Sequence, residues 1–426
     1  MEIVYPRSCG VDVHNSFIVA VICISESVKP KYIKKRFSTF NNQPVQFRDW
    51  LIENNCQNVC MKSTGKYYIP VYNALEGYIS NVVVANPKWV KAIKGKKGDK
   101  WIADLFKFGI VRSSYIPEKD IRILREFTRY QYKLVNMRSS EKNRFQNALT
   151  TGNCKLDLVF TDVFGKSASS IVDTILSNDP YASEDILSKV HARCKASHED
   201  ILSDVDGTQL NQFQKARIQI VQKHMKYLDS LLNEIQQHID LMVANYDDYI
   251  QLLCTIPGIN RKSAITIISE VVTDMSQWPS HRKLAVWAGL APRCNQSASK
   301  KKSVKISKAG VYLKPCLVQI AHAAIKDKKC DYYATKYNKI SKRRGKKRAI
   351  IAIARKILIA VYHLLKTGEV FNPTDMADVE TTKKQRIEYI KNNLRNAFNQ
   401  LSRTGLSEAE ILQFIRKEPT NSPQIE

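Results

Sequence analysis

Residues 9–24 read CGVDVHNSFIVAVICI and decide the fold of the N-terminal part of the chain. Apolar and β-branched side chains alternate and then run together on both sides of the polar residues 14–16. Such a pattern is typical of two β-strands joined by a tight turn. The sequence therefore predicts a β-hairpin with Asp12 inside its first strand.

Further apolar segments follow at residues 57–61 and 81–86, and the helix-like segment 67–77 separates them. Strands that alternate with helices are typical of a mixed sheet with helices packed on it. We therefore expect an α/β domain over residues 1–117.

Helical periodicity dominates the middle of the chain, residues 118–249. Residues 119–149 place apolar side chains on one helical face, and the polar stretch 150–208 indicates short helices. Apolar residues then recur at alternating steps of three and four, which is the seam of a coiled coil. The seam consists of Ile218, Val221, Met225, Leu228, Leu232, Ile235, Ile239, Met242 and Tyr246. It can be buried within the chain, in an antiparallel hairpin with 119–149, or between chains, and we expect some of each.

A second compact domain, mainly helical, is expected over residues 250–372. Within it, the turn at Gly258 and Asn260 is similar to a helix-hairpin-helix, in which backbone N–H groups at a helix N-terminus hold a nucleic-acid phosphate. An ordinary turn between two helices is the alternative interpretation. Residues 373–426 form a polar tail with possible short helices.

The composition indicates a partner with negative charge. Lysine and arginine number 67 against 40 aspartates and glutamates, a formal net charge of +27. Much of the excess lies in residues 88–100, 300–314 and 336–356. Such an excess favours binding to a nucleic acid. Because these segments do not form one basic amphipathic helix, we expect no membrane partner.

The ten cysteines are scattered, and several lie in apolar runs where a reduced thiol packs as a small hydrophobic group. Their spacing assigns none of them to a metal. No apolar run reaches the roughly 18 residues that cross a bilayer, and no secretory signal begins the sequence. We therefore expect a cytoplasmic protein.

The strongest chemical signal lies in residues 288–319, AGLAPRCNQSASKKKSVKISKAGVYLKPCLVQ. Ser297 lies in a polar segment whose composition favours a turn over a helix or strand. Arg293 precedes it, and five lysines follow it closely, so a hydroxyl at Ser297 would lie in a positive field suited to a phosphodiester. The lysines are Lys300, Lys301, Lys302, Lys305 and Lys308. The alternative is a solvated basic loop without chemistry.

Several segments, in their order along residues 8–372, resemble the bridge-RNA-guided insertion-sequence transposases of the IS-one-ten family. They are GVDV at 10–13, STGKYYIPVYNALE at 63–76, KWIADLFK at 100–107, IPGIN at 256–260, WAGLAPRCNQSA at 287–298 and SKAGVYLKPCLVQIAHAAIK at 307–326. The resemblance implies a RuvC-like domain of ribonuclease-H type, a coiled-coil insertion and a C-terminal transposase domain. It further implies a serine-dependent DNA recombinase that works with a structured noncoding guide RNA as a homo-oligomer, dimer or tetramer.

In that family an Asp-Glu-Asp-Asp quartet binds Mg²⁺ and assists the serine nucleophile. Ser297 matches the serine, and Asp12 matches the first carboxylate. Lys62 stands where the glutamate is expected, and only Asp99 remains near the second of the later aspartates. Asp104 is a poor substitute, because a step of five residues turns a helix by about 140° and points two carboxylates apart. Asp12 and Asp99 are left as weak Mg²⁺ ligands.

Three functions are compatible with these residues. The first is a recombinase in which Ser297 forms a phosphoserine linkage to DNA. The second, motivated by Lys62, is a transposase derivative that binds DNA and RNA without cutting; alternatively, Lys62 contacts the scissile phosphate in place of a metal. The third is a nucleoid or repair accessory protein with no history of transposition.

Overall fold

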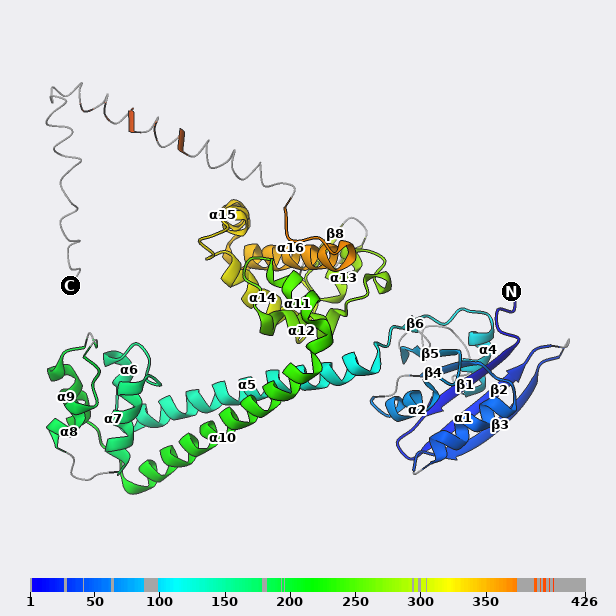
Figure 1. Cartoon of the computed structure of the whole chain (residues 1–426), viewed down its shortest axis with the longest axis horizontal. Helices are drawn as coiled ribbons and strands as arrows, with labels where there is room; N and C mark the ends of the chain where they lie inside the picture. Colours follow the sequence, from blue (N-terminus) through cyan, green and yellow to red (C-terminus); the bar gives the residue numbers. More distant parts are fainter. Residues whose placement is uncertain are drawn as a thin grey trace. The chain divides into compact units, whose positions relative to one another are not determined.

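The computed structural model describes residues 2–26, 29–40, 42–62, 65–87, 99–177, 182–192, 194, 196–292, 295–297, 300–303, 305–373, 387–388, 391, 394–395, 398 and 401. The chain divides into two compact units, Met1–Glu118 and Lys119–Glu426, each of which is considered by itself (Figure 1). The four-part division expected from the sequence stays a prediction.

The first unit is built on a mixed six-stranded sheet of order β3-β2-β1-β4-β5-β6. Antiparallel pairs join β1 to β2, β2 to β3 and β5 to β6, while β1, β4 and β5 run parallel. The predicted hairpin is confirmed, and its turn is closed by the His14 N–H, which donates to the Phe17 carbonyl at 2.9 Å. The strands are β1 (Arg7–Val13), β2 (Phe17–Ile24), β3 (Lys31–Ser38), β4 (Asn58–Lys62), β5 (Asn81–Ala85) and β6 (Ser113–Ser114).

Helices cover both faces of this sheet. The side chains of Cys9, Val11 and Val13 on β1 share a core with α1 (Gln43–Glu53) and α2 (Tyr68–Leu75). Alternate residues of a strand point to opposite faces. Accordingly, Ser8 Oγ donates to the Ala103 carbonyl of α4 (Asp99–Lys107), and Cys60 of β4 packs against α4.

The second unit contains a long antiparallel helical hairpin. It pairs α5 (Lys119–Thr151) with α10 (Gln212–Met242) (Figure 1). Leu134 of α5 shares a core with Leu228 and Ile235 of the predicted seam, so the intrachain alternative is confirmed. A polar contact accompanies it, because Gln131 Nε2 donates to Gln236 Oε1 at 2.9 Å.

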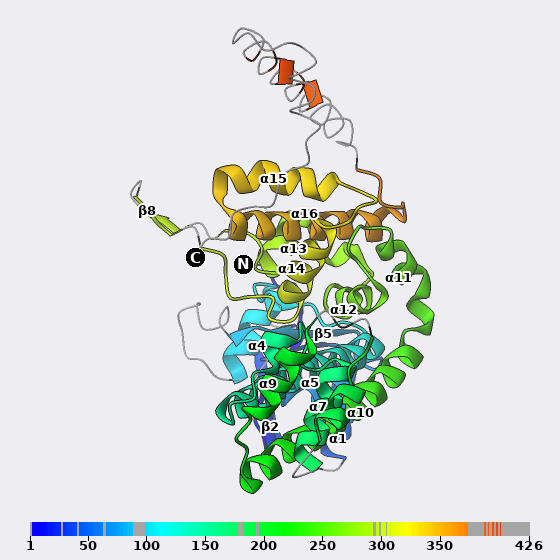
Figure 2. The same ribbon diagram turned by 90° about the vertical axis from the view of Figure 1, so that its left-hand side faces the viewer.

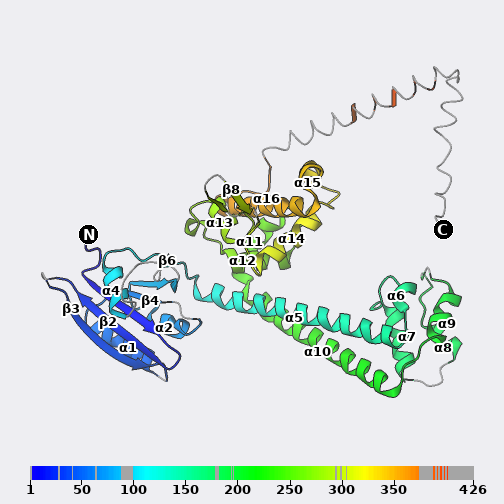
Figure 3. The same ribbon diagram turned by 180° about the vertical axis from the view of Figure 1, so that it is seen from behind.

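Four short helices pack between the distal ends of α5 and α10 (Figure 3). Their core includes Leu156, Ile171 and Val205 together with Phe145 of α5 and Ile218 of α10. The prediction of short helices at 150–208 is therefore confirmed. They are α6 (Leu156–Val159), α7 (Lys166–Ser177), α8 (Ser183–Ser188) and α9 (His198–Asp206).

The remaining helices of the second unit surround the apolar helix α16 (Figure 2). Ile353, Ile357 and Val361 of α16 are fully buried. The helices are α11 (Asp247–Cys254), α12 (Arg261–Val271), α13 (His281–Trp287), α14 (Leu313–Ala324), α15 (Tyr332–Arg344) and α16 (Lys346–Thr367), with 3-10 turns η1 (Ala244–Tyr246) and η2 (Met275–Gln277). A hairpin of β7 (Asn295–Ser297) and β8 (Lys300–Ser303) lies between α13 and α14. The short helices that the sequence predicts in the tail, at 382–402 and 407–417, fall largely outside the described residues.

Two further sequence-based expectations can be compared with the described part of the chain. The nine cysteines in it are all free thiols. Among its helices, none is both long enough and apolar enough to span a bilayer.

Gly258 provides a test of helix packing in the second unit. It has a φ of +85°, and a Cβ there would lie 2.7 Å from both Ala324 N and Ile320 O of α14. Gly368 has a similar φ of +75° with nothing within 4 Å. We expect Gly258→Ala to lower the free energy of unfolding by about 1–3 kcal/mol more than Gly368→Ala, because overpacking adds to backbone strain. Urea denaturation measures both, and equal losses would contradict the packing.

Candidate catalytic residues and basic surfaces

Asp12 and Lys62 meet at the carboxyl ends of the parallel strands β1 and β4. Pairing of β1 with β4 aligns Val11 with Met61, so Asp12 and Lys62 occupy the next position along the register. Lys62 Nζ lies 3.2 Å from Asp12 Oδ1, and His14 Nε2 lies 3.6 Å from Asp12 Oδ2. The carboxylate predicted as a metal ligand is therefore held by an ammonium group and faces an imidazole.

These residues do not fit a magnesium ion. Mg²⁺ takes oxygen ligands in an octahedral shell, and Lys62 brings a positive charge to the carboxylate that would have to bind it. The side chains of Lys62 and Asp12 are only 23% and 20% exposed, so water screens their attraction incompletely. In the part of the chain that the structure describes, no cluster of three or more His, Cys, Asp or Glu could hold a metal.

Helix α4 begins at Asp99, the second predicted ligand. The Lys107 carbonyl accepts from the Val4 and Tyr5 N–H groups, while Ala103 lies beside Ser8, so α4 runs antiparallel to β1. Its N-terminal end therefore lies toward the end of β1 that carries Asp12. The side chain of Asp99 falls outside the described atoms, and its role stays a prediction.

Asp104 is engaged elsewhere on α4. Its Oδ1 accepts from Tyr32 Oη at 2.7 Å and from Lys107 Nζ at 3.0 Å. Burial and the hydrogen bond to Asp104 raise the pKa of Tyr32, because both disfavour the phenolate. Asp104 is thus bound to Tyr32 and Lys107.

Ser297 lies in a strand, which corrects the expectation of a turn. It is the last residue of β7 and stands opposite Lys300, while Gln296 stands opposite Lys301. Composition favoured a turn because serine, asparagine and lysine have little strand preference; antiparallel pairing of the backbone supplies the strand instead. Residues 298 and 299, between the two strands, lie outside the described residues.

The base of this hairpin is tightly built. Pro292 and Ile306 form an isolated antiparallel bridge. Gly289 and Gly310 pack so closely that a Cβ on either would overlap the carbonyl of the opposing segment. Lys314 Nζ donates to the carbonyls of Ser307 at 2.8 Å and Ala309 at 2.9 Å. The strands that carry Ser297 therefore extend from a fixed base.

The predicted phosphate-binding cations around Ser297 are only partly described. Lys305 and Lys308 are exposed. Lys300, Lys301 and Lys302 lie on β8, but their side chains fall outside the described atoms, and Arg293 lies outside the described residues altogether. Their roles stay predictions.

Gly258 and Asn260 lie in the turn that joins α11 to α12, where the sequence predicts a helix-hairpin-helix or an ordinary turn between helices. Asn260 Oδ1 accepts from the Ser263 N–H at 2.9 Å, and Ser263 Oγ accepts from the Asn260 N–H at 2.9 Å. This capping box satisfies two backbone donors at the start of α12. The turn and the capping box therefore explain Gly258 and Asn260 structurally. Phosphate binding by these two residues stays a prediction.

The structure shows a second basic surface, which the sequence indicated only as the lysine- and arginine-rich segment 336–356. Six exposed cations flank Gly345, where α15 ends and α16 begins. The first turn of α16 carries no acidic residue, and its N-terminus has no side-chain cap. Cations at a helix N-terminus are unfavourable unless an anion is present. These residues, the basic corner, are Lys342, Arg343, Arg344, Lys346, Lys347 and Arg348.

Comparison with known proteins assigns the family. Residues 250–338 match the model described as Transposase IS116/IS110/IS902 family, and residues 9–153 match the DEDD-type IS110 model described as Transposase. A Coxiella burnetii (strain RSA 493 / Nine Mile phase I) protein, the transposase for insertion sequence element IS1111A, is 30% identical over 132 residues. That match covers 30% of this chain and 36% of the relative, so the chain matches little more than a third of the relative's length.

The two family models together span more than half of the chain. The chain therefore belongs to the IS116/IS110/IS902 transposase family, with a DEDD-type N-terminal domain and a mainly helical C-terminal domain. The DEDD-type domain carries an expectation of a divalent metal, which the pairing of Lys62 with Asp12 opposes.

Replacing Lys62 tests whether its ion pair with Asp12 prevents Mg²⁺ from binding. We expect Lys62→Glu to place two carboxylates together and to lower the free energy of unfolding by about 1–3 kcal/mol without metal. Millimolar Mg²⁺ should then raise the melting temperature of Lys62→Glu, because a ligand that binds only the folded state stabilises it. Exposed Lys66→Glu makes the same charge change away from Asp12 and serves as control. A Mg²⁺-induced shift of equal size in the unaltered protein would contradict the interpretation; thermal unfolding measures all three.

Proposed function

We propose that the protein is a DNA transposase that cuts and rejoins DNA through the hydroxyl of Ser297. The observation that carries the proposal is the family match over residues 250–338, because that region contains Ser297 and the lysines of β8. Backbone pairing of Ser297 with Lys300 supports the proposal, since a cation opposite the nucleophile attracts the anionic substrate.

The proposed chemistry is covalent. Attack by Ser297 Oγ on a phosphodiester forms an O–P bond, while the P–O bond to one deoxyribose breaks. The departing oxygen takes up a proton, and the Oγ proton passes to solvent. The phosphoserine retains the energy of the broken bond, so a hydroxyl of another strand can reverse the step and join new ends.

We propose that the protein binds two nucleic acids, the DNA and a structured noncoding guide RNA. The net charge of +27 and the six exposed cations of the basic corner support binding to both. Neutralising phosphates releases counterions, so binding should weaken steeply with salt. We also propose a cytoplasmic location, which a DNA substrate and the free thiols of the nine described cysteines support.

We further propose that the protein works as a homo-oligomer. Four large apolar side chains of α10 are strongly exposed and fall in register at multiples of seven residues, so they share one face of the helix. This face is separate from the seam that α5 buries. Such a stripe fits the same stripe of a second copy. It consists of Phe213, Ile220, Tyr227 and Leu241.

A derivative that binds without cutting is the second candidate function. The ion pair between Lys62 and Asp12 favours it, because the carboxylate expected to hold Mg²⁺ is neutralised. In this function the basic surfaces would still hold DNA and RNA, but Ser297 would form no bond to phosphorus.

An adduct assay separates the two functions. The full chain is incubated with DNA containing the element ends, with or without the adjoining noncoding RNA, and with Mg²⁺ or Mn²⁺. We expect a denaturant-stable protein–DNA adduct that Ser297→Ala reduces by at least about a thousandfold. Ser299→Ala, which removes a hydroxyl two residues away, should retain it. An adduct that requires the RNA supports guidance.

Two results would count against the cutting function. Absence of any adduct, with steep salt-dependent binding retained, favours the binding derivative. An adduct that survives Ser297→Ala assigns the nucleophile to another residue.

The oligomer proposal has its own test. Ile220 and Tyr227 are 66% and 60% exposed, so replacing both by Ser should leave the fold intact while reducing self-association by about tenfold or more. Val286 and Val311, 58% and 61% exposed, provide a control double replacement by Ser. Analytical ultracentrifugation measures the mass distribution. A monomeric unaltered protein, or equal effects of both replacements, would refute the proposed contact.

A further inference from the structure

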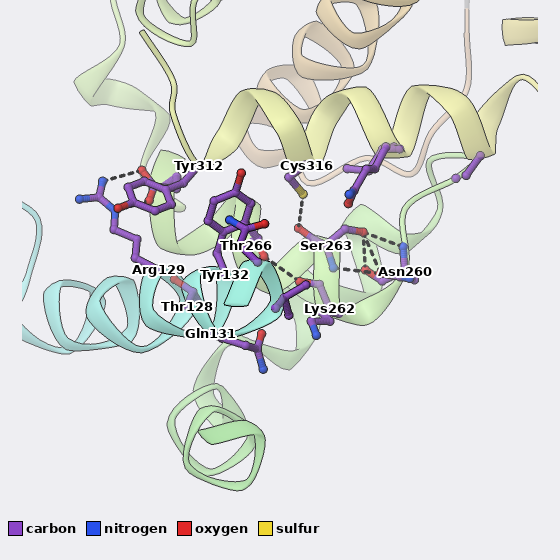
Figure 4. A pocket seen from close by; sticks show the side chains of 17 residues that line it. Thr128, Arg129, Gln131, Tyr132, Asn260, Lys262, Ser263, Thr266, Tyr312 and Cys316 are labelled. Carbon is purple, nitrogen blue, oxygen red and sulfur yellow. Dashed lines mark hydrogen bonds and ion pairs between the residues drawn. The ribbon is translucent and has the colours of Figure 1, made fainter. Parts of the chain in front are cut away.

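A cavity of about 470 Å³ lies among α5, α12 and α14, within the second unit (Figure 4). Its volume falls in the range of roughly 300–1,000 Å³ that is usual for small-ligand pockets. The helices that line it are distant in sequence, and the Gly258 turn forms part of its wall. Neither the family match nor the residues proposed for cutting accounts for it.

One end of the cavity is aromatic. Tyr132 and Tyr312 meet edge to face, with ring centroids 5.5 Å apart. The Arg129 guanidinium lies 4.8 Å from the Tyr312 ring centroid and donates to both carboxylate oxygens of Glu270, at 2.6 and 2.8 Å. Arg129 and the buried Glu270 neutralise each other, so this end offers flat apolar surface beside a half-buried ion pair.

The other end of the cavity is cationic. Lys262 lies in the first turn of α12, is exposed, and has no ion pair with any residue that the structure describes. The first turn of α12 contains no acidic residue. Figure 4 shows Lys262 near Asn260 and Ser263, on the opposite side from Arg129 and Tyr312. An anionic group is therefore favoured at this end by both the ammonium and the helix dipole.

Uncharged polar side chains also line the cavity. Thr266 comes from α12, and Gln319 comes from α14. Hydroxyl and amide groups of this kind offer both donors and acceptors. The cavity thus combines a stacking surface, neutral hydrogen-bonding groups and, in Lys262, a cation that forms no ion pair with a described residue.

We propose that this cavity holds one unpaired nucleotide, with its base against Tyr132 and Tyr312 and its phosphate toward Lys262. Bases stack on aromatic side chains in a sequence-tolerant way. A base inside a duplex cannot enter such a pocket without leaving its stack, so the ligand is single-stranded or extruded. The inference rests on the proposed function to the extent that the nucleotide belongs to the nucleic acid that the protein handles, either an RNA loop or an unpaired DNA segment.

Binding measurements on a cleavage-deficient protein test the proposal independently of the chemistry. In a full-length Ser297→Ala background, affinities are measured for labelled single-stranded RNA, single-stranded DNA and duplex DNA of one sequence. We expect Tyr312→Ala to weaken single-strand binding by about tenfold and Tyr312→Phe to change it by less than about twofold, because phenylalanine keeps the stacking surface. Duplex binding should be unchanged. Lys262→Gln should lower the salt slope for single strands by about one.

Photocrosslinking covers the case in which Tyr312→Ala perturbs the fold. Oligonucleotides that contain 5-iodouridine or 5-iododeoxyuridine are irradiated with the same Ser297→Ala protein, which retains both tyrosines. Crosslinks to Tyr132 or Tyr312 support the proposal, and the stronger of the RNA and DNA arms identifies the source. Crosslinks confined to other segments, or equal losses of single-strand and duplex binding in Tyr312→Ala, overturn it. If the unaltered protein forms no adduct with DNA but the binding and crosslinking results are as expected, the cutting function is refuted and the nucleotide site is retained.

Discussion

The second unit depends on a carboxylate that is held out of water. Glu270 of α12 is 5% exposed and is matched by two hydrogen bonds from Arg129 of α5. Arg125, one turn earlier, donates to the carbonyls of Ser269 and Glu270. A buried charge without its partner costs several kcal/mol, so this contact sets how the helical hairpin meets the C-terminal helices. It also forms one wall of the cavity, which links helix packing to the proposed nucleotide site.

In the first unit, the residues that stabilise the fold are different from the residues expected to carry the chemistry. Its sheet and its two helical layers depend on apolar side chains such as Val11, Met61 and Phe106, which are buried. Asp12 and Lys62 lie at the carboxyl ends of the central strands β1 and β4 and contribute no apolar core. A lysine can therefore occupy the expected glutamate position without loss of the family fold, because the ion pair compensates the charge that it introduces.

Local patterns predicted most of the fold, and long-range contacts account for the rest. The hairpin at 9–24 and the seam of α10 follow from periods of two and of three to four residues, which are properties of each segment alone. The strand at Ser297 was missed because its pairing, rather than its composition, makes it a strand. Lys62 was recognised as a departure by resemblance, but its contact with Asp12 joins residues that lie 50 positions apart. The Arg129–Glu270 pair spans 141 positions, and no periodicity reports such a contact.

The seam of α10 is closed by α5 of the same chain, and this has a thermodynamic consequence for assembly. A coiled coil formed between chains has no stable folded monomer, so its stability rises and falls with protein concentration. Here the helical hairpin of α5 and α10 gains its core within one chain, so the fold of a single copy does not depend on protein concentration. The proposed association of copies would then be a separate, reversible equilibrium, which the expression level of the protein could set without affecting its folding.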